Sequence, residues 1–177
     1  SDNGREYFST AFCDFLVGHG ILHQSSCSYT PQQNGVAERK NRHLIETART
    51  LLLHHSVPFK FWADAVLTAC YLINRMPSSV LNNAIPFSVL YPHEPLYSLP
   101  LRVFGCVCFV HDHSPGLDKL QPRAIKCVFL GYSRVQKGYR CFSSITGRYY
   151  FTADVNFSES LPYFSESSTS PTSLPFP

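Results

Sequence analysis

The first hundred residues alternate between stretches of helical periodicity and short runs of turn-forming residues. Apolar side chains recur every three to four positions in residues 7–16, from about 36 to 55, and in 61–73, which predicts amphipathic helices there. Pro77 ends the last of them, because proline does not continue a helix. Residues 21–25 predict a short strand. The helix from about 36 to 55 is expected to bury one stripe, formed by Leu44, Ile45, Ala48, Leu51 and Leu52.

The pattern changes to a period of two after residue 100. β-branched and aromatic runs, separated by Gly, Ser-Pro-Gly and Thr-Gly turns, predict four or five short strands within residues 101–158. Such strands suit a small antiparallel β-barrel, since closure removes the exposed edges. Residues 59–100 predict a helix followed by a proline-rich connector, and the Ser/Thr/Pro-rich residues 159–177 are expected to be disordered. With residues 1–58 as the first part, four segments follow one another along the chain.

Composition places the protein in a broad class. At 177 residues with 44% hydrophobic content, the chain can form a packed core. It opens with Ser1 and not with methionine, so we interpret it as a piece of a longer protein. Its apolar runs are shorter than the roughly eighteen residues that a membrane helix needs, so no membrane partner is expected. The seven cysteines are odd in number and mostly lie in apolar runs, which favours buried, reduced thiols in an intracellular protein.

Charge is distributed unevenly, although the formal net charge is only +3. Between Asp118 and Arg148 a single acid accompanies seven cations, and an acidic, Ser/Thr/Pro-rich end follows. A basic module of this kind is typical of nucleic-acid binding, and equally of a sheet edge protected by charged side chains. The cations are Lys119, Arg123, Lys126, Arg134, Lys137, Arg140 and Arg148.

Two short motifs carry the candidate chemistry. In "SYTPQQNGVAERKNR", residues 28–42, Glu38 is a single acid beside Arg39, Lys40 and Arg42. It can form an ordinary i, i+4 pair with Arg42, worth a few tenths of a kcal/mol, or it can bind a metal. In "SDNG", residues 1–4, Asp2 can form an Asx turn. Thirty-five residues separate Asp2 from Glu38.

Taken together, "SDNG" and "YTPQQNGVAERKNR" resemble the second half of the integrase core of copia-type long-terminal-repeat retrotransposons, in which an Asp and a Glu are separated by thirty-five residues. "KLQPRAIKCVFLGY" and "KGYRCF" resemble the small β domain that follows this core, so the likeness extends to about Ser160. The resemblance implies an α+β chain. Its expected parts are a partial RNase H-like core of helices plus one orphan strand, a helical connector, and a small SH3-like antiparallel β-barrel.

The same resemblance implies a catalytic role for two carboxylates. Joining a DNA end to another strand is a phosphoryl transfer that divalent ions assist at the attacking and leaving oxygens. The positions that match the family's metal ligands are Asp2 and Glu38, and the implied ion is Mg²⁺ or Mn²⁺. The residues expected to contact DNA are Gln33, Asn34, Arg39, Lys40, Arg42, Lys119, Arg123, Lys126, Lys137 and Arg140.

The chain also departs from the family pattern. The integrase core uses three acids, and the first belongs to a strand upstream of Ser1, as does the family's zinc-binding segment. We therefore expect weak Mg²⁺ binding and no strand transfer by this chain alone. DNA and other integrase subunits are the implied partners, and the nucleus is the implied location. Two alternatives stay open: a non-catalytic module that binds nucleic acid or a protein partner, and a decayed element with no selected function.

Overall fold

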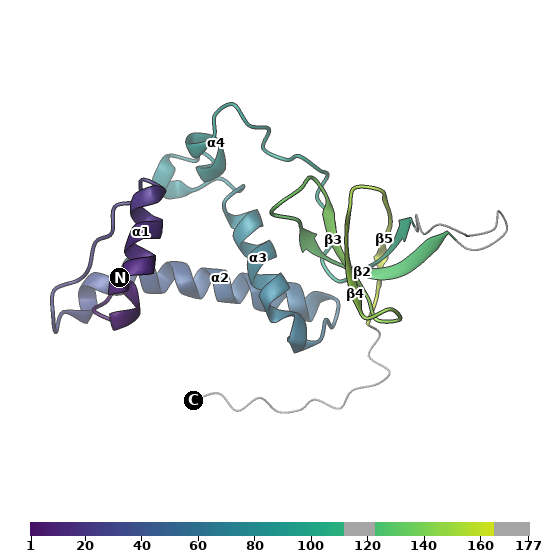
Figure 1. The fold of residues 1–177 in the computed structure, drawn as a ribbon, viewed down its shortest axis with the longest axis horizontal. Coiled ribbons are helices and arrows are strands. Elements are labelled where there is room, and N and C mark those ends of the chain that lie inside the picture. The colour runs from purple at the N-terminus through teal and green to yellow at the C-terminus, as the bar shows by residue number, and fades with distance from the viewer. Residues whose placement is uncertain (112–122, 165–177) are drawn as a thin grey trace. The chain divides into compact units, whose positions relative to one another are not determined.

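The computed structural model describes residues 1–111 and 123–164 of the chain (Figure 1). These residues form two compact units, an N-terminal unit, Ser1–Ile45, and a C-terminal unit, Glu46–Pro177. The structure thus divides the chain at a different place from the segment boundaries expected at residues 58 and 100. Among the described residues, no helix is both long and apolar enough to span a membrane.

The N-terminal unit contains short helices, extended chain and the first part of a long helix that continues into the C-terminal unit. The 3₁₀ helix η1, Arg5–Phe8, precedes α1, Thr10–Gly18. The helix predicted from residue 7 is interrupted because Ser9 has an extended backbone, with φ −67° and ψ 141°. A second 3₁₀ helix, η2, Pro31–Asn34, leads into α2, Gly35–His54, which starts one residue before the predicted position.

The predicted strand at residues 21–25 is not formed, and this correction has a local cause. In the described structure this segment forms the hydrogen bonds of a strand pair with a single residue, Ser1. The Ser1 amino group donates to the Gln24 carbonyl at 2.8 Å, and the Ser26 N–H donates to the Ser1 carbonyl at 2.9 Å. These two bonds flank Ser25 in the pattern of a parallel pair. A single such pair does not make a strand.

Helices form the first part of the C-terminal unit. Beyond the end of α2 come η3, Phe59–Phe61, and α3, Trp62–Ile73, which confirms the predicted helix there. The connector then contains η4, Ser79–Leu81, and α4, Pro86–Leu90. The stripe expected along α2 is only partly buried, since Ala48 is buried whereas Ile45 is 50% exposed.

The sheet contains five antiparallel strands in the order β4-β3-β2-β1-β5, which confirms the predicted β domain. The last strand, β5, continues to Pro162, past the expected end of this domain at residue 158. Residues 165–177 of the predicted tail lie outside the described residues. The strands are β1, Cys106–His111, β2, Ala124–Tyr132, β3, Tyr139–Ser143, β4, Arg148–Thr152, and β5, Val155–Pro162.

Alternation along the strands buries side chains on both faces of the sheet. One face holds a cluster of four buried thiols, the cysteine cluster, which packs with Phe129 and Tyr139. Burial raises the pKa of Cys106 and of Cys127 to about 12, so these thiols stay protonated at neutral pH. The cysteine cluster consists of Cys106, Cys108, Cys127 and Cys141, all free.

Helix α3 covers the opposite face of the sheet. Phe61, at the start of this helix, lies 5.2 Å from Phe142 of β3, measured between ring centroids. Thr68 donates from its Oγ1 to the Leu130 carbonyl at 3.2 Å, in a buried position. A side chain at Gly131 would meet that same hydroxyl, so the helix approaches β2 closely at this point. Helix and sheet therefore share one core.

Candidate metal-binding carboxylates and nucleic-acid surface

Asp2 lies in an exposed turn at the start of the N-terminal unit. Its Oδ1 accepts a hydrogen bond from the Gly4 N–H at 3.1 Å, which is the Asx turn foreseen for this motif. The preceding residue is held by side-chain and backbone bonds: Ser1 Oγ lies 2.7 Å from His23 Nε2. His23 in turn lies among the rings of Tyr7, Phe8 and Phe12. The backbone that carries Asp2 is therefore anchored, while the carboxylate faces solvent.

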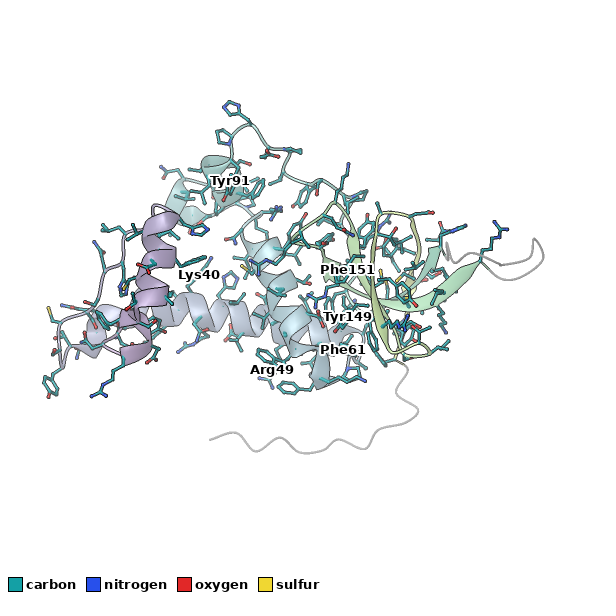
Figure 2. All side chains as sticks on the ribbon, viewed as in Figure 1. Lys40, Arg49, Phe61, Tyr91, Tyr149 and Phe151 are labelled. Carbon is teal, nitrogen blue, oxygen red and sulfur yellow. The ribbon has the colours of Figure 1, made fainter. Side chains whose placement is uncertain are left out.

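Glu38 lies in the first turn of α2 and is exposed. An acid at this position is favoured by the helix dipole. Among the residues that the structure describes, Glu38 forms no ion pair, so the ordinary pairing with Arg42 is not formed. Arg39 and Lys40 are likewise exposed on this helix, and Lys40 is labelled in Figure 2. Both carboxylates thus belong to one compact unit and keep oxygen atoms available for a ligand.

The loop before α2 is built by the polar residues of the motif. The Gln33 Oε1 accepts the Cys27 N–H at 2.8 Å, which ties η2 to the chain that precedes it. Asn34 is half-buried at the end of η2. Gln33 therefore already has a structural partner in a position where DNA contact was predicted.

Three of the cations predicted on the β domain have exposed side chains. Arg123 directly precedes β2, Lys126 lies on this strand, and Lys137 lies in the loop before β3. The Lys126 ammonium also lies 5.6 Å from the ring centroid of Tyr163. Lys119 lies outside the described residues.

Arg140 has a partner that the sequence interpretation did not foresee. Its Nε lies 3.0 Å from Asp64 Oδ1, and the Tyr149 hydroxyl donates to Asp64 Oδ2 at 2.8 Å. Asp64 is only 4% exposed, on the face of α3 that packs on the sheet. Burial raises the pKa of Asp64, while the Tyr149 hydrogen bond and the Arg140 charge act in the opposite direction. Burial, reinforced by Asp64, raises the pKa of Tyr149 to about 12, so the phenol stays a donor.

Asp64 could have been found from the sequence by its position. It lies on the apolar face of the predicted helix, three residues after Phe61 and four before Thr68. An acid within an apolar stripe predicts a buried partner, since an unpaired buried charge is very costly. Its partners come from strands about eighty residues away, which no local pattern identifies.

In the described part of the chain, the cysteines and histidine of β1 do not form a metal site. Cys106 and Cys108 point into the core, and His111 is exposed. Within residues 1–111 and 123–164, no group of three or more His, Cys, Asp or Glu side chains is arranged to hold a metal ion. Asp2 and Glu38 stay the candidates as a pair.

Residues 106–171 match the family described as the retroviral polymerase SH3-like domain. This match fits the five-stranded antiparallel sheet. Together with the similar proteins described below, it defines the class of protein to which the chain belongs. The chain belongs to the copia-type Pol polyproteins of retrotransposons.

Several similar proteins come from plants. The Retrovirus-related Pol polyprotein from transposon RE1 of Arabidopsis thaliana is 42% identical over 165 residues, which cover 93% of this chain and 11% of the polyprotein. The corresponding polyprotein from transposon TNT 1-94 of Nicotiana tabacum is 44% identical over 160 residues, 90% of this chain and 12% of the polyprotein. A shorter relative, "Uncharacterized mitochondrial protein AtMg00710" of Arabidopsis thaliana, is 42% identical over 86 residues, 49% of this chain and 68% of that protein. The chain thus spans about a tenth of the two polyproteins.

Proposed function

We propose that the chain acts in DNA integration, as the part of a retrotransposon integrase that supplies two metal-binding carboxylates and a nucleic-acid-binding β domain. One observation carries this proposal: Asp2 and Glu38, the positions that match the family motif, are exposed, without ion pairs, and in the same compact unit of the described structure. The membership of the chain in the copia-type family gives this pair its meaning.

The carboxylates fit the ion that the family implies. Carboxylate oxygens are the ligands that Mg²⁺ and Mn²⁺ prefer, and within residues 1–111 and 123–164 neither of these two side chains forms an ion pair. The Oδ1 of Asp2 accepts one hydrogen bond, from the Gly4 N–H, so the carboxylate still has lone pairs that can bind a metal ion. When bound, the ion supplies charge stabilisation at the oxygens of the phosphate being transferred. The role of the chain is to hold the ligands and, through Arg39, Lys40 and Arg42, to contact the phosphate backbone.

Metal binding is tested with conservative variants of α2. We expect wild-type chain to bind Mn²⁺ weakly in titrations followed by paramagnetic resonance, and Glu38→Gln to remove most of that binding. Glu46→Gln is the matched control, because Glu46 is an exposed acid of the same helix. Equal Mn²⁺ affinity for wild type and Glu38→Gln would contradict the assignment.

Activity is tested with a processed DNA end and a supercoiled target. We expect no joining by the purified chain, because two carboxylates do not complete a three-acid site. Robust joining would show that the 177 residues are sufficient and would overturn the proposed inactivity.

The second candidate function, a non-catalytic nucleic-acid-binding module, is favoured by the exposed cations on a well-packed β domain. Duplex affinity should fall steeply with salt, because phosphate contacts release counterions. Arg123→Gln and Lys137→Gln should each lower the slope of log affinity against log salt by about 1. Binding that does not change with salt would exclude this role. Arg140 is left out of this set because it pairs with Asp64.

A further inference from the structure

Two exposed aromatic rings lie on one face of the β3–β4 hairpin in the C-terminal unit. Tyr149 and Phe151 are 38% and 44% exposed, and their ring planes are within 20° of parallel. Their centroids are 6.4 Å apart. The strand register pairs Tyr149 with Phe142 and Phe151 with Arg140, so all four side chains share this face. Figure 2 labels Tyr149 and Phe151 beside β3 and β4. We call Arg140, Tyr149 and Phe151 the aromatic ledge.

The buried carboxylate of Asp64 holds two residues of the aromatic ledge, Tyr149 and Arg140. The Tyr149 hydroxyl donates to Asp64 Oδ2 at 2.8 Å, and Arg140 Nε lies 3.0 Å from the other oxygen. The Arg140 guanidinium lies 4.8 Å from the Tyr149 ring centroid and 5.8 Å from that of Phe151. The Tyr149 ring is therefore held by its hydroxyl before any ligand arrives, which lowers the entropic cost of binding, and Phe151 lies near the same guanidinium.

The surroundings of the ledge are positively charged. Residues 133–152, which include the whole hairpin, contain four cations and no acid. Because Arg140 pairs with Asp64, the cations of this segment that form no ion pair within the described residues are Arg134, Lys137 and Arg148. The Lys60 ammonium adds a charge from η3, since it lies 5.9 Å from the centroid of Phe142. Exposed rings within a field of cations suit a polyanion whose units also stack, because each base has a π face and each linkage a negative charge.

We propose that the aromatic ledge binds the unpaired bases of single-stranded nucleic acid. This inference rests on the proposed nucleic-acid binding and names the form of the ligand. The bases of a duplex are stacked at a rise of about 3.4 Å and have no free faces. Rings 6.4 Å apart are separated by nearly twice that rise, so successive bases reach both rings only on an extended, unstacked strand. The exposed cations Arg134, Lys137 and Arg148 contact the phosphates of that strand.

The test uses the full chain and three fluorescently labelled probes of about twelve nucleotides, within the range of single-strand site sizes. The probes are an oligo-dT strand, an abasic strand with the same number of phosphates, and a duplex. We expect oligo-dT to bind about tenfold more tightly than the abasic strand, since stacking of one base contributes about that factor. This comparison needs no variant, so it holds even if a substitution disturbs folding.

Variants then locate the contact. Phe151→Leu keeps the apolar volume and removes the π face, and should weaken oligo-dT binding about tenfold while changing duplex affinity less than twofold. Tyr91→Leu is the control, because Tyr91 is a similarly exposed aromatic residue, 54% exposed, that lies at the end of α4, away from the ledge (Figure 2). It should leave binding of every probe unchanged.

The outcomes separate the two proposals. Equal affinity for oligo-dT and the abasic strand, or unchanged oligo-dT binding by folded Phe151→Leu, overturns the ledge while duplex binding keeps the proposed function. Absence of binding to all probes overturns both, and a protein partner then becomes the better occupant of the ledge.

Discussion

Replacing Gly131 by alanine should weaken the contact between α3 and the sheet. Gly131 lies in β2 with a φ of +123°, a region that residues with a side chain rarely adopt. A Cβ at this position would be 2.1 Å from the Oγ1 of Thr68. The hydroxyl cannot simply move away, because it donates to the Leu130 carbonyl from a buried position. The substitution therefore combines backbone strain with a steric clash.

The magnitude follows from these two costs. Overpacking a filled site typically costs about 1–3 kcal/mol, and an unfavourable positive φ costs about 1–2 kcal/mol. We expect Gly131→Ala to lower the free energy of unfolding by about 3 kcal/mol. Gly147→Ala is the matched control, because Gly147 has a φ of +67° but nothing within 4 Å of an added Cβ. It should cost only about 1 kcal/mol.

A second substitution isolates the clash. Thr68→Ala removes the obstructing hydroxyl and its buried hydrogen bond, and should cost about 1 kcal/mol by itself. In the double variant the clash is relieved, so the free energy of unfolding should fall by about 2.5 kcal/mol. Simple addition of the two single-variant losses would give about 4 kcal/mol. The coupling of about 1.5 kcal/mol is within the range that contacting residues show.

The assay is urea unfolding followed by fluorescence and circular dichroism. The chain has one tryptophan, Trp62, at the start of α3, so its emission reports directly on this helix. The reasoning would be refuted if Gly131→Ala were no more destabilising than Gly147→Ala. Strict additivity in the double variant would equally contradict the close approach of α3 to β2.

Three further predictions concern the C-terminal unit. Burial raises the pKa of Asp64 above its ordinary value of 3.8, so between these two pKa values the folded state holds a proton that the unfolded chain has lost. The free energy of unfolding should therefore fall as pH rises from 3.8 through the raised pKa. Urea midpoints measured across this range should show the fall in wild type but not in Asp64→Asn. At pH 8, iodoacetamide should label Cys27 and Cys70 readily, while mass spectrometry finds the cysteine cluster unmodified until urea is added. Truncation after Ser158 should lower the urea midpoint of unfolding, because it removes half of β5.

The periodic elements could be predicted because their causes are local. The apolar stripe of α3 reflects burial against the sheet, and the β-branched and aromatic runs of β1 to β4 reflect burial on one or both faces of the sheet, so both were recognisable in the sequence. The strand at residues 21–25 was wrong because a strand needs a partner, and periodicity does not say whether one is present. β5 extends past residue 158 although Glu159 lies in a Ser-rich stretch, because the Glu159 carboxylate binds Arg102 at 2.6 Å and accepts the Val103 N–H.

In the candidate site too, contacts between neighbours in the chain could be predicted, whereas contacts between distant segments could not. The Asx turn at Asp2 was one alternative open from the sequence, and the helix predicted from about residue 36 put Glu38 in its first turn; both features depend on neighbours in the chain. The pairing of Arg140 with Asp64 depends on the docking of a helix on a sheet, so composition alone counted Arg140 as a free cation. Charge counts therefore overestimate a nucleic-acid surface wherever a distant acid is buried beneath it.

The distribution of core residues decides which substitutions report on function. Within the described part of the N-terminal unit, Leu16 is the single buried hydrophobic residue, whereas the C-terminal unit contains the cysteine cluster and the α3 interface. The side chains of Asp2 and Glu38 are exposed, so their amide variants should change the free energy of unfolding by less than about 0.5 kcal/mol. Losses of metal binding in those variants can be attributed to the carboxylates. Asp64 supports both the fold and the aromatic ledge, so its substitution changes stability and binding together, and only Phe151 separates the two effects.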